Sequence, residues 1–259
     1  LYTSDNVRIS SLGESDRYEI QGGLEGLRNI SFKPNDDVSG VTQFRFEVVD
    51  DGDSYGELAS RSIEEVVNIS IYAVNDAPEI IQGSFNDLVV NEGSALASLG
   101  LEDLEFGPGG GSDELSQSMT YQVNMLPTGS IGSVFLSDGL TEVRAGADYS
   151  LSDIQGMQFL ADTDNIGTGK FGVRVLDELG AVSQFTLDIR TRPVNDAPIR
   201  TSGKVSQLVI TEDSPRSSLG FDDLSFAAGG GIDEARQPNQ IVITSIPSPD
   251  RGTLYLSNG

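Results

Sequence analysis

Apolar and polar residues alternate along several short segments of the chain. Between residues 170 and 175, apolar side chains occupy every second position, at Phe171, Val173 and Val175. The same alternation occurs at 44–48, 67–71, 121–125 and 185–189. Alternation with a period of two puts apolar side chains on one face of a strand and polar side chains on the other. Since no segment shows sustained helical periodicity, the pattern predicts an all-β protein with antiparallel sheets.

Turn-forming residues separate these predicted strands. Examples are Ser-Asp-Gly at 137–139, Asn-Ile-Gly at 165–167 and Glu-Leu-Gly at 178–180. Roughly seven short strands in about 120 residues are typical of an immunoglobulin-like β-sandwich. A β-solenoid is the alternative, but its repeats are far shorter than the period found below.

The chain repeats itself. The segment Val-Asn-Asp-Ala-Pro at 74–78 recurs at 194–198, and Gly-Gly-Gly at 109–111 recurs at 229–231, both 120 positions later. Phe44 and Phe171 correspond at a spacing of 127. We therefore predict that residues 1–78 are the C-terminal half of a repeat, 79–198 a complete repeat, and 199–259 the N-terminal half of the next.

Both ends of the chain fall at the same place in the repeat, inside a strand and turn. We expect the chain to be a piece of a longer array, whose partners are neighbouring repeats of the same polypeptide. Half a sandwich cannot bury its own core. The two half-repeats are therefore expected to complete each other, more easily between chains than within one, as a strand-complemented homo-oligomer.

The composition is strongly acidic. Forty Asp and Glu residues face sixteen Lys and Arg residues, a formal net charge of −24. Nucleic acid and anionic membranes would repel such a surface, and no apolar stretch of about eighteen residues predicts membrane insertion. The acid excess fits either solubility or binding of Ca²⁺, which takes about six to eight oxygen ligands. The absence of Cys and His excludes disulfides, the usual zinc ligands and Ser-His triads.

Acidic and amide side chains recur in register and are the candidate metal ligands. The Asn-Asp pairs before the boundary prolines also fit simple Asx-turns. Residues 162–167 are rich in oxygen but are not an EF-hand loop, since Val173 stands where that loop needs Glu. The glycine-rich loop lacks the Gly-Lys-Ser/Thr ending of a phosphate-binding loop. The candidates are Asp36, Asp37, Asp50, Asn75, Asp76, Glu92, Asp103, Asp113, Glu114, Asp162, Asp164, Asp177, Asn195, Asp196, Glu212, Asp223, Asp233 and Glu234.

The boundary motif, the Leu-Gly-x-x-Asp-Leu-x-Phe segment followed by Gly-Gly-Gly-x-Asp-Glu, and residues 151–159 together resemble cadherin-like tandem repeats of bacterial RTX-type surface adhesins. The resemblance implies Ca²⁺ between consecutive domains, an extracellular location on the bacterial surface, and type I secretion. Asn195 and Asp196 match the Asn-Asp of the cadherin linker. Ala197 replaces the linker's last Asn, and Pro193 and Ala73 stand near its first Asp, so one or two ions are expected at each junction.

The resemblance also suggests a role for each acid around the second boundary. Glu92 corresponds to the early cadherin glutamate, and Asp162 with Asp164 to the acidic pair of the preceding domain. Asp233 and Glu234, or Asp223, correspond to the acids of the following domain. The junction at Asp196 is expected to gather these side chains.

The function expected from these observations is that of a stalk that holds a distal binding domain for adhesion or biofilm formation. The alternative is a calcium-dependent module that binds sugar or another copy of itself, for which Tyr55 and Phe106 are the best aromatic candidates. A glycosidase with paired carboxylates is a third possibility. The acids recur with the repeat, however, which favours a structural role, and we predict that the chain is not an enzyme.

Overall fold

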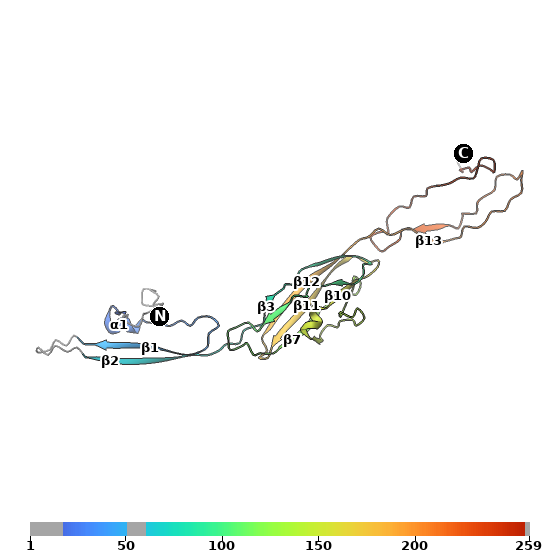
Figure 1. The fold of residues 1–259 in the computed structure, drawn as a ribbon. Coiled ribbons are helices and arrows are strands. Elements are labelled where there is room, and N and C mark those ends of the chain that lie inside the picture. Colours follow the sequence, from blue (N-terminus) through green and yellow to red (C-terminus); the bar gives the residue numbers. More distant parts are fainter. Residues whose placement is uncertain (1–17, 51–60, 257–259) are drawn as a thin grey trace. The chain divides into compact units, whose positions relative to one another are not determined.

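The computed structural model describes residues 18–50 and 61–256, and these residues form an all-β protein with two short helices (Figure 1). The helices are α1 (Gly23–Arg28) and α2 (Leu151–Gln155). The strands are β1 (Gly40–Val49), β2 (Ser62–Ile71), β3 (Glu79–Gln82), β4 (Leu88–Asn91), β5 (Ala97–Ser98), β6 (Glu105–Gly107), β7 (Met119–Met125), β8 (Gly132–Phe135), β9 (Asp148–Tyr149), β10 (Gln158–Ala161), β11 (Gly167–Asp177), β12 (Val182–Arg192), β13 (Ile199–Ser202) and β14 (Ser225–Ala227).

Two sheets carry the hydrophobic core. One has five strands in the order β4-β12-β11-β7-β9, and the other has three in the order β5-β10-β8. Strands β12 and β4 are parallel, with Ile189 opposite Leu88, whereas β10 is antiparallel to both of its neighbours. The inward side chains of both sheets are buried, including Phe171 on β11 and Phe159 on β10. The predicted alternation and β-sandwich class are confirmed.

The helix α2 lies in the connection from β9 of the five-stranded sheet to β10 of the three-stranded sheet. Its N-cap, Ser150, accepts a hydrogen bond from the Asp153 backbone while the Asp153 side chain accepts one from the Ser150 backbone. Such a capping box satisfies helix donors that otherwise lack partners. The single buried residue of the helix, Ile154, contributes to the core.

Besides these two sheets, the described residues form three two-stranded sheets. Strands β1 and β2 make a two-stranded antiparallel sheet in continuous register, from Gly40 opposite Ile71 to Val49 opposite Ser62. Strands β13 and β14, like β3 and β6, form another two-stranded sheet. Apart from Pro78, the buried aliphatic and aromatic side chains of the described chain all lie between Leu99 and Ile189.

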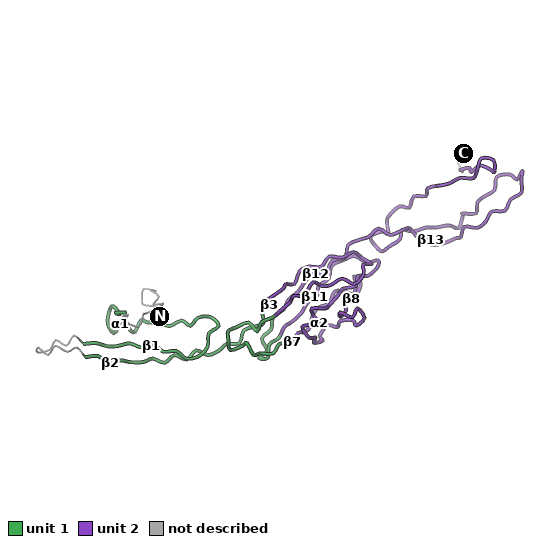
Figure 2. Tube along the Cα trace, viewed as in Figure 1, with its two compact units in different colours: residues 1–79, 106–119, 176–183 green, residues 80–105, 120–175, 184–259 purple. Residues whose placement is uncertain are grey.

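The chain divides into two compact units (Figure 2). One comprises residues 1–79, 106–119 and 176–183, and the other 80–105, 120–175 and 184–259. The boundary segment 74–78 and the loop 109–114 both belong to the first unit, and the segment 194–198 and the loop 229–234 both belong to the second. The division into repeats at residues 78 and 198 stays a prediction. No helix of the described residues has the length and apolar character needed to cross a bilayer.

Candidate cation-binding junctions

A buried glutamate holds the backbone of the first boundary segment. Glu114 follows the glycine-rich loop, and only 2% of its surface is exposed. Its Oε1 accepts a 2.8 Å hydrogen bond from the backbone N–H of Asp76, and its Oε2 accepts one of 3.0 Å from Gly110. A carboxylate is costly to bury unless hydrogen bonds or positive charge compensate it, and here two backbone N–H groups do so. Because Glu114 accepts from both Asp76 and Gly110, it links the boundary segment to the loop.

The glycines of the loop allow oxygens to approach it closely. A Cβ at position 110 would lie 2.6 Å from Asp76 Oδ2 and 3.0 Å from Glu114 Oε2. Side chains at 109 and 111 would collide with the carbonyl oxygens of Ala77 and Asp37, respectively. Since real Cβ atoms do not come so near, the sequence Gly-Gly-Gly is needed for this oxygen-rich arrangement.

The second boundary repeats this arrangement. Glu234, which is 1% exposed, accepts a 2.6 Å hydrogen bond from the backbone N–H of Asp196. A Cβ at position 230 would lie 2.8 Å from Asp196 Oδ2 and 2.9 Å from Glu234 Oε2. Positions 229 and 231 face the carbonyl oxygens of Ala197 and Asp164, as 109 and 111 face those of Ala77 and Asp37. The same sequence motif therefore brings equivalent pairs of residues together at both boundaries.

A second buried glutamate binds the start of this boundary segment. Glu92 is 5% exposed and its Oε1 accepts a 2.7 Å hydrogen bond from the backbone N–H of Val194. The next residue but one, Asp196, is held by Glu234. Two carboxylates, one before and one after this segment in the sequence, therefore accept hydrogen bonds from the N–H groups of Val194 and Asp196. These two N–H groups are at most roughly 7 Å apart along the backbone.

Several buried oxygens at the second boundary lack hydrogen-bond partners. They are Glu92 Oε2, Asp233 Oδ1 and Glu234 Oε2. A buried polar atom without a partner costs about 1–3 kcal/mol, and more when it is charged. These three acceptors are therefore free to accept hydrogen bonds or a cation. At the first boundary, Glu114 Oε2 is bound by Gly110, and the unpartnered buried oxygen is Oε1 of Gln117.

Neighbouring negative charges repel the carboxylate of Asp76. Burial raises the pKa of Asp76, and repulsion from Asp37, Glu114 and Asp113 raises it further. The first boundary therefore brings these four acids within electrostatic reach. A carboxylate with a raised pKa is destabilised in its charged form, and a bound cation would relieve this cost.

Asp177 is occupied by hydrogen bonds rather than open to a ligand. Its Oδ1 accepts backbone N–H bonds of 2.9, 2.6 and 2.9 Å from Leu179, Gly180 and Ala181. Its Oδ2 accepts one of 2.8 Å from the Asn75 amide. Burial would raise the pKa of Asp177, but the hydrogen bonds outweigh it and lower the pKa. Asp50 also has a backbone partner, since its Oδ1 accepts a 2.7 Å hydrogen bond from the N–H group of Arg61.

The loop after β10 forms a compact cluster of its own. Asp162 Oδ1 accepts hydrogen bonds from the Asn165 side chain at 2.7 Å and from the Asp164 backbone at 3.2 Å. These bonds lower the pKa of Asp162. The Asp162 carbonyl oxygen also accepts the Gly93 N–H at 2.7 Å, which joins this loop to the residue after Glu92.

Other predicted ligands are not gathered in this way. Asp36 and Glu212 are exposed. Asp103 and Asp223 face Gly83 and Gly203 through their backbone carbonyls. Across residues 18–50 and 61–256, no three acidic side chains form a group that could hold a metal ion as they are placed in this structure.

Of the two aromatic candidates for ligand binding, Phe106 is not exposed to a ligand. Phe106 is buried in β6, with 6% of its surface exposed, so its prediction as an exposed loop aromatic was wrong. Tyr55 lies outside the described residues.

A side chain that was not predicted is Gln117, whose amide donates a 2.9 Å hydrogen bond to Asn75 Oδ1. Its recurrence as Gln237 at the 120-residue spacing was the signal that could have identified it.

Neither a family model nor a curated protein matches the chain. Similar solved structures include cadherin domains 1–5 of protocadherin gamma B2, with 17% identity, coverage of 68% of this chain and 30% of that one, and a TM-score of 0.35. For human mucin-like protocadherin domains 1–2 the identity is 15%, the coverages are 58% and 69%, and the TM-score is 0.30. A third structure is a Bacteroides ovatus protein, SGBP-B of a mixed-linkage glucan utilization locus, in complex with a mixed-linkage heptasaccharide. Its identity is 15%, the match covers 51% of this chain and 28% of that one, and the TM-score is 0.22.

The chain spans 35%, 37% and 30% of the length of the first three protocadherin structures that it resembles. All of these TM-scores are below 0.5, so the similarities carry no statement about ligands, partners or activity. The structure itself shows an all-β sandwich in which two equivalent carboxylates, Glu114 and Glu234, hold the backbone of two equivalent segments.

Proposed function

We propose that this chain is a calcium-stiffened part of the stalk of a bacterial cell-surface adhesin. In this proposal, cadherin-like repeats of about 120 residues follow one another and hold a distal binding domain away from the cell. The protein is of the RTX type, leaves the cell by type I secretion, and acts in adhesion or biofilm formation without enzymatic activity.

The observation that carries the proposal is the duplicated boundary geometry. Asp76 and Asp196 donate backbone N–H bonds to Glu114 and Glu234 at 2.8 and 2.6 Å. Catalytic carboxylates serve one substrate and need no second copy in register. A stalk, by contrast, requires the same mechanical joint at every boundary.

The residues at the boundaries fit a hard cation. Ca²⁺ prefers carboxylate and carbonyl oxygens, and the second boundary offers the unpartnered oxygens of Glu92, Asp233 and Glu234. The side chain of Asp196 and the carbonyl of Asp164 lie against the same loop. At the first boundary, the corresponding groups are the side chains of Asp76, Asp113 and Glu114 and the carbonyl of Asp37.

A bound Ca²⁺ would neutralise these carboxylates and link groups on both sides of a boundary. Asn195 and Asp162 would complete the coordination at the second boundary, whereas Asn75, whose amide is bonded to Asp177 and Gln117, would orient the first boundary segment. Asp177 has both oxygens engaged, and we propose that it positions Asn75 rather than binding the ion. Since the ion binds only the folded boundary, it would stabilise that boundary by mass action.

The proposal is tested by calcium titration calorimetry on the chain and on Glu234→Gln and Glu92→Gln. Each substitution keeps the size of the side chain and its acceptor oxygen but removes the charge. We expect each to weaken calcium binding at least tenfold at one class of site. The matched control, Glu142→Gln, alters an exposed glutamate in the central repeat and should leave binding unchanged. Absence of any heat of calcium binding to the unmodified chain would overturn the proposal.

A further inference from the structure

The side chain of Gln117 joins the first boundary segment to the turn that follows the glycine-rich loop. Its Nε2 donates a 2.9 Å hydrogen bond to Oδ1 of Asn75. The backbone N–H of Gln117 donates a 2.9 Å bond to the carbonyl oxygen of Glu114. The Glu114 carboxylate in turn accepts the backbone N–H of Asp76 at 2.8 Å. These three bonds close a ring between residues 75–76 and residues 114–117.

The carboxylate of Asp177 fixes the orientation of the Asn75 amide. A carboxylate only accepts hydrogen bonds, so Nδ2 of Asn75 must face it, and the two atoms are 2.8 Å apart. Oδ1 of Asn75 is then turned towards Gln117, whose Nε2 is the end of that amide that can donate. The orientation of one amide therefore decides that of the other, and the series of bonds runs from Asp177 through Asn75 to Gln117.

The backbone part of this ring recurs at the second boundary. Gln237 follows Gln117 at the 120-residue spacing, and its N–H donates a 2.8 Å bond to the carbonyl oxygen of Glu234. The carboxylate of Glu234 accepts the Asp196 N–H at 2.6 Å. The Asn195 amide donates to the Asp196 carbonyl at 3.3 Å. The two backbone bonds therefore belong to the motif itself, whereas the boundary asparagines have different partners.

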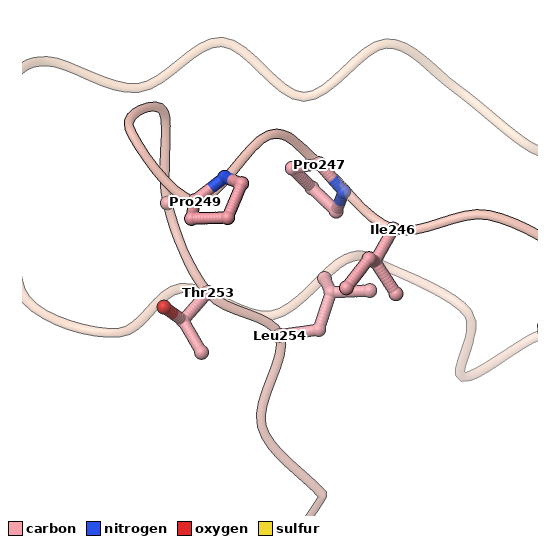
Figure 3. Close-up of a pocket in the computed structure, with 6 residues that line it drawn as sticks. Ile246, Pro247, Pro249, Thr253 and Leu254 are labelled. Atoms are coloured by element: carbon pink, nitrogen blue, oxygen red, sulfur yellow. The ribbon is translucent and has the colours of Figure 1, made fainter.

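Polar contacts of this kind distinguish the first boundary from the apolar hollow at residues 246–254, which has a volume of 260 Å³ (Figure 3). That hollow is lined by Ile246, Pro247, Pro249, Gly252, Thr253 and Leu254. None of these side chains is an amide or a carboxylate, so the hollow offers no group that could orient an amide.

We propose that Gln117 is a positioning residue of the first boundary, which acts through Asn75 to hold residues 75 and 76 in place before any cation binds. The ring needs no metal ion, because each of its bonds joins groups of the chain itself. It also keeps the Asp76 backbone on Glu114, whose carboxylate belongs to the proposed calcium site. A site that is already ordered loses less freedom when its ligand binds, so Gln117 strengthens calcium binding. Only this last consequence rests on the proposed calcium function.

The first test is amide hydrogen exchange of the full chain in chelator, where no cation contributes. Gln117→Met keeps the length of the side chain but cannot donate to Asn75. We expect exchange of the Asp76 N–H to become roughly fivefold faster, as the loss of one hydrogen bond predicts. The matched control, Gln184→Met, alters an exposed glutamine of the central repeat and should leave that rate unchanged. Exchange of the Val173 N–H should be the same in all chains, which shows that the sandwich stays folded.

The second test asks whether Gln117 acts through Asn75. In a chain that carries Asn75→Ala, the Gln117 amide has lost its acceptor, so adding Gln117→Met should change exchange at Asp76 by less than about twofold. If Gln117 only filled space, the effects of the two substitutions would be additive. Equal acceleration by Gln117→Met in both backgrounds, or no acceleration in either, overturns the proposal.

The third test uses Eu³⁺, a hard cation whose luminescence lifetime reports how many water molecules it binds. A chain with Glu92→Gln and Glu234→Gln confines strong binding to the first boundary. In that chain, Gln117→Met should weaken Eu³⁺ binding roughly fivefold without changing the number of bound waters. An additional bound water would show that Oε1 of Gln117, which is buried and unpartnered, is a ligand, and would overturn the positioning role. If the unmodified chain binds neither Eu³⁺ nor Ca²⁺, the calcium function fails, while the exchange rates still decide the role of Gln117.

Discussion

The carboxylate of Asp177 accepts a 2.8 Å hydrogen bond from the side-chain amide of Asn75, although the two residues are 102 positions apart. Asn75 belongs to the boundary segment, whereas Asp177 ends β11. The other side of Asn75 accepts the Gln117 amide at 2.9 Å. The boundary segment is therefore fixed to two distant parts of the chain by hydrogen bonds that need no metal ion.

Replacing Asp177 with Asn should destabilise this arrangement. The substitution keeps the shape but removes the charge that accepts the bonds from Asn75 and from residues 179–181. A hydrogen bond to a charged group contributes about 1.5–3 kcal/mol, so we expect a loss of about 2 kcal/mol in urea unfolding. The loss should already be present in chelator, because these hydrogen bonds need no metal ion.

The control for this variant is Asp188→Asn, which removes an exposed ion pair with Lys170. Exposed pairs contribute about 0–1 kcal/mol. If Asp177→Asn abolished calcium binding without changing stability in chelator, Asp177 would be a ligand, as its position in the sequence suggested.

The stability that depends on Asp177 should vanish in acid. Its folded-state pKa is lowered, so the native state binds fewer protons than the unfolded state in the window between the two pKa values. Its contribution is complete above the unfolded-state pKa and is lost as the pH falls through the lowered value. Urea unfolding across this acidic range should show a smaller pH dependence for Asp177→Asn than for the unmodified chain.

Asp76→Asn should have opposite effects in chelator and in calcium. The pKa of Asp76 is raised by burial and by Asp37, Glu114 and Asp113, so its charge opposes folding above the raised pKa. Removing that charge should slow amide hydrogen exchange at residues 76 and 110 in chelator. In calcium the same variant lacks a ligand and should exchange faster than the unmodified chain.

The control for Asp76→Asn is Asp222→Asn, which alters an exposed aspartate and should change exchange in neither condition. A change of the same sign in chelator and in calcium would mean that Asp76 is not part of a cation site.

Gly111→Ala should disturb the first boundary. The added Cβ would collide with the backbone carbonyl oxygen of Asp37, and overpacking of this kind costs about 1–3 kcal/mol. We expect a loss of that size in thermal unfolding and weaker calcium binding. Gly129→Ala is the matched control, because its Cβ would meet no atom within 4 Å. Equal stability of the two variants would show that the loop does not need its close approach.

The sequence was sufficient to predict the β-class, because alternation along segments such as 170–175 reports directly which face of a strand is buried. The 120-residue spacing also separates repeated acids from scattered ones, and two of the repeated acids, Glu114 and Glu234, accept hydrogen bonds from the equivalent residues Asp76 and Asp196. Phe106 shows where this reasoning stops. Its neighbourhood in the sequence is a glycine-rich loop, but β6 places its ring in the core.

The sequence alone determined the β class of this protein and the recurrence of its acids at a spacing of 120 residues, since strand periodicity and repeat spacing can be read along the chain. Only the tertiary structure decided which acids remain available for a cation. Glu92 and Glu234 are left with unpartnered oxygens, whereas Asp177 is saturated by Asn75 and its own turn. The reason is physical: an oxygen's capacity to bind a ligand depends on the donors that already surround it, and residues more than a hundred positions away supply some of those donors.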